Sequence, residues 1–181
     1  MKRNLAILLL ILTTVLSCKT PEARKPKSVN SGSFIDQSVA RNKALNKKEI
    51  KAIETLIASQ PENNYKTSGN GFWYYYNTKI ETDSIVKPDF ADIVNFNYDV
   101  KDLDGKTIYT QAELKTQSYA MDQQELFTGL REGLKLMQAG ETVTFLFPSH
   151  KAYGYYGDEN KIGTNIPLVC KVTVNSITKK E

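Results

Sequence analysis

The sequence contains few of the residues on which catalytic and metal-binding chemistry usually depends. Among its 181 residues are two cysteines, Cys18 and Cys170, and one histidine, His150. No second histidine or cysteine lies at metal-ligand spacing from His150, which removes most support for a zinc site or a histidine-activated nucleophile. No glycine-rich loop opens a helix, so no phosphate-binding loop is indicated. We therefore expect no cofactor and no metal.

Charge of one sign and long membrane-spanning runs are also lacking. The 24 lysines and arginines nearly balance 20 aspartates and glutamates, and this gives no support for a nucleic-acid partner. The apolar run of residues 5–16 has 12 residues, whereas a spanning helix needs roughly 20. With 40% hydrophobic residues, the composition excludes collagen, coiled coil and wholesale disorder.

The N-terminus has the pattern of an export signal. Two basic residues precede the apolar run, and small residues follow it, so residues 1–17 are predicted to be a signal peptide. Val15-Leu16-Ser17-Cys18 resembles the lipobox of bacterial lipoproteins, in which the cysteine becomes the lipidated N-terminus. We expect lipidation at Cys18, which would anchor the protein in the cell envelope, facing the periplasm. An ordinary cleaved signal with an incidental cysteine is the alternative, but a lone exposed thiol in an oxidising compartment is a liability.

The segment after the signal is basic and poor in apolar residues. Residues 19–48 hold eight basic and two acidic side chains. Residues 18–45 are predicted to be a tether, which either lies against anionic lipid headgroups or is a solvated linker.

Residues 46–68 are predicted to form an N-terminal helix and a connector. Asn46 followed by Glu49 has the form of a capping box, which predicts a helix over residues 47–59 that ends before Pro61. The apolar stripe of this helix either docks on its own domain or binds a partner or a second copy.

From residue 69 onward, hydrophobic residues mostly alternate with period two, which indicates strands. The expected strands are 72–76, 93–101, 106–111, 142–147 and 168–174, with a turn at Asp104-Gly105 and one helix within residues 124–138. Cys170 has the inward parity of its strand and is interpreted as a core residue. The predicted fold is α+β: an antiparallel sheet of about five strands wrapped around one short helix, forming a domain of residues 69–181 and preceded by the N-terminal helix.

Several motifs in this half of the chain occur in the order and spacing of a known family. They are Glu132-Gly133-Leu134-Lys135-Leu136-Met137, Phe147-Pro148-Ser149, Ala152-Tyr153-Gly154 and Ile166-Pro167-Leu168-Val169. Over residues 69–179 the sequence resembles the FKBP-type peptidyl-prolyl cis-trans isomerases. The signal, the basic arm, the helix and the aromatic run 72–77 further resemble the gliding-motility-associated FKBP-type lipoproteins.

The resemblance implies an apolar pocket that grips the proline ring of a polypeptide. The pocket it implies is formed by Phe96, Ile108, Leu126, Phe127, Leu130, Tyr153, Ile162 and Cys170, with Tyr109 at the rim. By the resemblance, the Tyr153 hydroxyl and the Phe127 amide would hold substrate carbonyls, and Leu130 would form the floor. For each of these residues, a purely structural role in the core is the alternative.

The sequence also departs from the family pattern around this pocket. Ile108-Tyr109 stands where Phe-Asp is usual, Gln117 stands where an aromatic residue is expected, and Cys170 replaces Phe. Restoring the carboxylate with Tyr109→Asp is therefore expected to raise activity.

Two functions remain open from the sequence. The first is an isomerase, or rotamase, that acts on proline-containing exported or envelope proteins and serves a gliding-motility machine. The second is a catalytically weak chaperone or binding subunit of an envelope complex.

Overall fold

The computed structural model describes residues 31–82 and 85–181. The predicted signal peptide, Cys18 and the part of the tether before residue 31 lie outside the described residues. The chain divides into two compact units, Met1–Ser38 and Val39–Glu181. The described part of the first consists of the opening turns of helix α2, and all packing described below belongs to the second.

Helix α2 (Ser31–Ser59) is longer than the sequence patterns predict. Residues 31–45 are helical, so the predicted tether is wrong over this stretch. The reason is local: residues 40–45 include Ala, Arg, Lys and Leu, which favour a helix, and no proline lies between residues 31 and 60. The predicted C-terminal end at Ser59 is confirmed.

The predicted capping box is also wrong, because Asn46 and Glu49 lie in the middle of α2. The Asn46 Oδ1 atom is buried with no hydrogen-bond partner among the described residues. Glu49, only 5% exposed, instead accepts hydrogen bonds from the backbone N–H of Ser149 at 2.8 Å and from its hydroxyl at 2.7 Å. One turn further on, Ile53 is completely buried. The inner face of α2 therefore docks on its own domain.

The domain is built on one antiparallel sheet of seven strands, where about five were expected. Their order is β1-β2-β6-β7-β3-β4, with β5 paired to β3 outside this path. Beyond the expected strands, β1 and β5 are present. The bounds are β1 (Lys66–Thr67), β2 (Trp73–Thr78), β3 (Ile93–Lys101), β4 (Thr107–Tyr109), β5 (Gln117–Ala120), β6 (Thr142–Phe147) and β7 (Leu168–Thr178).

The alternation that predicted β3 is confirmed by its burial. Val94, Phe96, Tyr98 and Val100 are buried, and the residues between them are partly exposed. Strand β7 lies between β6 and β3 and pairs with both over most of its length.

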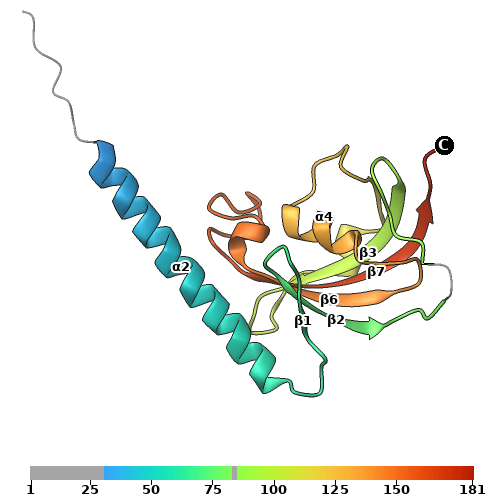
Figure 1. Cartoon of the computed structure of the whole chain (residues 1–181), viewed down its shortest axis with the longest axis horizontal. Coiled ribbons are helices and arrows are strands. Elements are labelled where there is room, and N and C mark those ends of the chain that lie inside the picture. Colours follow the sequence, from blue (N-terminus) through green and yellow to red (C-terminus); the bar gives the residue numbers. More distant parts are fainter. Residues whose placement is uncertain (1–30, 83–84) are drawn as a thin grey trace, which may run out of the picture. The chain divides into compact units, whose positions relative to one another are not determined.

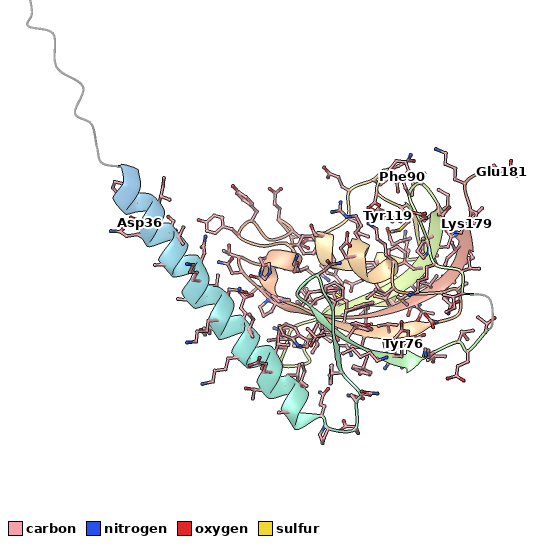
Figure 2. All side chains as sticks on the ribbon, in the orientation of Figure 1. Asp36, Tyr76, Phe90, Tyr119, Lys179 and Glu181 are labelled. Carbon is pink, nitrogen blue, oxygen red and sulfur yellow. The ribbon has the colours of Figure 1, made fainter. Side chains whose placement is uncertain are left out.

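The residues after β7 are held by Asp92. Lys179 (Figure 2) places its Nζ 2.7 Å from Asp92 Oδ2, and the Asp92 Oδ1 atom accepts the Lys180 N–H at 2.9 Å.

Helix α4 (Thr128–Leu134) covers one face of the sheet (Figure 1). It is shorter than residues 124–138, because Phe127 has the extended backbone of an N-cap and the chain after Leu134 forms turns. Two glycines set its distance from the sheet. A Cβ atom at Gly129 would lie 2.5 Å from a Phe147 ring carbon, and one at Gly133 would lie 2.9 Å from the Phe145 ring. The helix therefore rests directly on the stacked rings of β6.

The remaining helices are short. Helix α3 (Gln111–Leu114) follows β4, and the 3-10 helix η1 (Ser149–Lys151) follows β6. No helix of residues 31–82 and 85–181 has both the length and the apolar character needed to cross a bilayer.

Candidate active site

The structure brings the nine predicted site residues into one hydrophobic cluster under α4. Four of them are buried: Phe96 on β3, Leu130 on α4, Ile162 in the loop between η1 and β7, and Cys170 on β7. The other five are partly buried against this cluster: Ile108, Tyr109, Leu126, Phe127 and Tyr153. The partly buried group comes from β4, the N-terminus of α4 and the loop after η1, and these segments form the edge of the cluster.

Tyr98 belongs to the same group but was not among the predicted site residues. Its ring centroid lies 5.5 Å from that of Phe96. Burial raises the Tyr98 pKa, and the neighbouring Tyr153, Cys170 and Tyr109 raise it further, so these side chains lie close together. Its inward parity on β3 was visible in the sequence, but parity alone indicates a core residue and says nothing about a hydroxyl.

Tyr153 and Phe127 form the aromatic edge of the site. Their ring centroids lie 5.1 Å apart, and Phe127 also meets Phe147 edge-on at 5.4 Å. Burial, with a smaller contribution from Cys170, raises the pKa of Tyr153 to about 12. The Tyr153 hydroxyl therefore stays protonated at neutral pH and can donate a hydrogen bond.

Three polar groups at this edge have no partner within residues 31–82 and 85–181. They are the hydroxyls of Tyr98 and Tyr153 and the backbone N–H of Phe127, none of which donates a hydrogen bond to a described residue. Unpaired donors beside an apolar cluster are what a polypeptide carbonyl requires, because a buried polar group is stabilised by a hydrogen bond. The arrangement can therefore bind an apolar ring and hold the carbonyls on either side of it.

One departure from the family pattern, Ile108-Tyr109, lies on β4 and packs against the cluster. Ile108 borders a hollow of about 420 Å³ together with Ile166 and Lys161. The Tyr109 hydroxyl makes a short hydrogen bond to the carboxylate of Asp158. Asp158 was not predicted as a site residue, because an acidic residue in a polar loop looks like an ordinary solvated charge.

Cys170 has the structural role expected from its parity. It is fully buried between neighbours on β3 and β6, and burial raises the pKa of its thiol well above the ordinary range. The thiolate required for nucleophilic chemistry is thus disfavoured.

Residues 86–175 match the family described as FKBP-type peptidyl-prolyl cis-trans isomerase. The chain belongs to this family. All nine predicted site residues fall inside the matched region, as does Tyr98. The matched region of the FKBP-type domain therefore begins before β3, includes helix α4 and ends within β7, whereas α2, β1 and β2 precede it.

Similar proteins extend this likeness beyond the matched region. The chain is 28% identical over 153 residues to the probable FKBP-type peptidyl-prolyl cis-trans isomerase FkpA of Neisseria meningitidis; the aligned part is 82% of this chain and 55% of that protein. This FKBP-type chain thus spans about half the length of the curated relative it matches.

Two solved structures share the fold. A peptidyl-prolyl cis-trans isomerase from Pseudomonas syringae pv. tomato is 23% identical with a TM-score of 0.58, and the match covers 74% of this chain and 96% of that one. FkpA from Escherichia coli is also 23% identical with a TM-score of 0.58, with 96% of this chain and 81% of that chain covered. The second match reaches into the N-terminal part of the chain.

Proposed function

We propose that this protein catalyses cis-trans isomerisation of peptide bonds that precede proline. The observation that carries the proposal is the edge formed by Tyr153 and Phe127, with an unpaired hydroxyl and an unpaired amide beside a buried apolar cluster. Membership of the FKBP-type family supports the same activity.

The chemistry of this reaction fits a site without a nucleophile. Rotation about the peptide bond meets a barrier of about 18–20 kcal/mol, because twisting removes amide resonance. A twisted amide is less dipolar than a planar one. Moving from water into an apolar site therefore costs the twisted amide less free energy than the planar one, and this difference lowers the rotation barrier. Each tenfold of acceleration needs about 1.4 kcal/mol of such preference. The Tyr153 hydroxyl and the Phe127 N–H would hold the flanking carbonyls while the bond turns.

The Tyr153→Phe variant tests the proposal. It removes one hydroxyl and little volume, so we expect catalytic efficiency on a cis-proline tetrapeptide to fall about tenfold, the value of one hydrogen bond, without loss of stability. Tyr155→Phe is the matched control, because Tyr155 lies in the same loop with its side chain 71% exposed. Equal efficiency in Tyr153→Phe and the wild type would remove this hydroxyl from the mechanism.

A second candidate is a binding subunit with weak catalysis, and the departures at Ile108 and Tyr109 favour it. The smaller wall at Ile108 and the aliphatic floor at Leu130 leave fewer aromatic surfaces around the proline ring. A well-folded wild-type protein that binds prolyl peptides but does not accelerate a proline-limited refolding phase would favour this candidate. Such phases otherwise take tens to hundreds of seconds.

We further propose that the protein acts on exported or envelope polypeptides from a lipid anchor at Cys18. Support comes from the signal-like residues 1–17 and from Val15-Leu16-Ser17-Cys18. Its partners would be proline-containing polypeptides, the membrane through the lipid, and an envelope complex of the gliding-motility type, which the N-terminal resemblance suggests.

A further inference from the structure

The loop that carries Tyr153 and Ile162 is tied to strand β4 through the side chain of Tyr109. The Tyr109 hydroxyl donates to Asp158 Oδ2 and accepts the Lys161 N–H at 3.3 Å. The other oxygen of Asp158 accepts the N–H of Asn160 at 3.0 Å and that of Ile162 at 2.7 Å. The Asp158 carboxylate thus connects Tyr109 directly to the backbone beside Ile162.

A second contact also joins this loop to the segment that follows β4. The Lys161 ammonium pairs with Glu113 of α3 and lies 4.8 Å from the centroid of the Tyr109 ring. Glu113 is itself held by its hydrogen bonds to Thr110, whose N–H donates at 2.8 Å. Lys161 and Glu113 are about half exposed, so solvent screens their attraction. The contacts of Tyr109 therefore contribute more to holding the loop against β4 than this ion pair does.

Backbone hydrogen bonds within the loop also hold it together. At its base the Asn165 N–H donates to the Gly154 carbonyl at 2.8 Å, and at its tip the Asp158 N–H donates to the Ile162 carbonyl at 3.1 Å. Within the described part of the chain, the side-chain hydrogen bonds joining this loop tip to other elements are those of Tyr109 and Glu113.

We propose that Tyr109 is a positioning residue that holds the loop of Tyr153 and Ile162 in its binding conformation, with Asp158 supplying the carboxylate at the rim. The inference rests on the proposed isomerase function. It also reverses the expectation for Tyr109→Asp: an aspartate there would lose both hydrogen bonds of the hydroxyl and place a second negative charge beside Asp158. That variant is therefore expected to lower activity.

The kinetic signature follows from how a positioning residue acts. In Tyr109→Phe we expect the loop to be in the binding conformation for only a fraction of the time. The apparent dissociation constant of the substrate then equals the intrinsic constant divided by that fraction. Once substrate has bound, the site is complete and the chemical step is unchanged. Tyr109→Phe should therefore raise KM about tenfold, the loss of one charge-assisted hydrogen bond, and leave kcat nearly unchanged.

The experiment compares the full-chain wild type with Tyr109→Phe, Tyr109→Asp and the control Tyr155→Phe. Three quantities are measured: kcat and KM on a cis-proline tetrapeptide, the dissociation constant of the same peptide, and hydrogen exchange of the Ile162 amide. Near-ultraviolet circular dichroism verifies the fold of each variant. In Tyr109→Phe the Ile162 amide keeps its own acceptor, so faster exchange reports release of the loop. We expect about tenfold faster exchange in Tyr109→Phe, a larger effect in Tyr109→Asp, and none in Tyr155→Phe.

Each result decides the proposal. Faster exchange together with a raised KM and an unchanged kcat supports it. A raised KM without faster exchange would mean that Tyr109 touches the substrate directly, and faster exchange with unchanged KM would mean that the loop does not limit binding; either overturns it. If the wild type itself has no isomerase activity, the proposed function fails separately. Exchange and peptide affinity then test the positioning role, and weaker peptide binding with faster exchange supports it, whereas no change in either overturns it.

Discussion

Glu49 provides the most direct test of how helix α2 is attached to the domain. The change is Glu49→Ala, which removes a carboxylate that is 5% exposed and accepts two hydrogen bonds from Ser149, itself 3% exposed. The helix would keep its sequence propensity, because alanine is the best helix former. Any loss of stability therefore reports the contact with Ser149 rather than the helix itself.

The expected magnitude follows from the two hydrogen bonds. A bond to a charged group contributes about 1.5–3 kcal/mol, and the two bonds share one acceptor group, so we expect a loss of about 3 kcal/mol. For a domain of this size, each kcal/mol lowers Tm by about 2–4 °C, which gives a fall of about 6–12 °C. Glu49→Gln keeps one neutral acceptor and should lose about half as much free energy.

Urea unfolding followed by circular dichroism measures these changes. Glu54→Ala is the matched control, because Glu54 is an exposed glutamate on the same helix. It should change the free energy of unfolding by no more than about 0.5 kcal/mol. If Glu49→Ala behaves like Glu54→Ala, the hydrogen bonds to Ser149 contribute nothing in solution and the attachment of α2 rests on Ile53 and its neighbours.

Two further predictions concern the anchor and acid stability. Cys18→Ala should leave an uncut precursor or release the protein into the soluble fraction, and membrane fractionation with unchanged yield in the pellet would refute lipidation at this cysteine. Hydrogen bonds from Lys179, Asp89 and Lys180 lower the pKa of Asp92 to about 2. Because the pKa is lowered in the folded state, the stabilisation by Asp92 is complete above about pH 4 and is lost as the pH falls towards 2. Asp92→Asn should make the free energy of unfolding depend less on pH over this interval. If the pH dependence is the same as in the wild type, the lowered pKa of Asp92 does not contribute to acid stability.

Strands with strict alternation could be predicted from the sequence. In β3 every second residue is buried, and the bounds of β6 match the predicted ones, because one face of each strand must meet the core. Alternation predicts burial less well where both faces of a strand are covered. Leu146 is 1% exposed although its parity points away from the face of Phe145 and Phe147.

Helix boundaries were harder to predict, because burial and helical periodicity are different properties. Leu126 and Met137 are packed at the helical spacing of Leu130 and Leu134, yet both lie outside α4. For Glu49, spacing indicated a capping box, while the actual partner, Ser149, lies 100 residues away in the sequence. Local patterns contain no information about such a contact.

The same limit applies to the candidate site. Motifs placed all nine predicted residues in one cluster, because their spacing follows the family pattern. Asp158 could not be predicted, since its importance comes from the substitution at Tyr109, which lies on strand β4, far from the Asp158 loop in the sequence. A compensating pair of this kind becomes visible only when both partners are seen together.

The position of β7 has a consequence for when this domain can fold. It is the last strand of the described chain, yet it lies in the interior of the sheet and joins β6 to β3, pairing Thr178 with Ile93. Until β7 is available, β3 lacks its longest partner and the two halves of the sheet are not connected. Pairings across such long stretches of sequence form slowly, because the loop must close before contacts compensate its entropy. A nascent chain therefore cannot complete its sheet until β7 has emerged, so the last step of synthesis also decides when the domain closes.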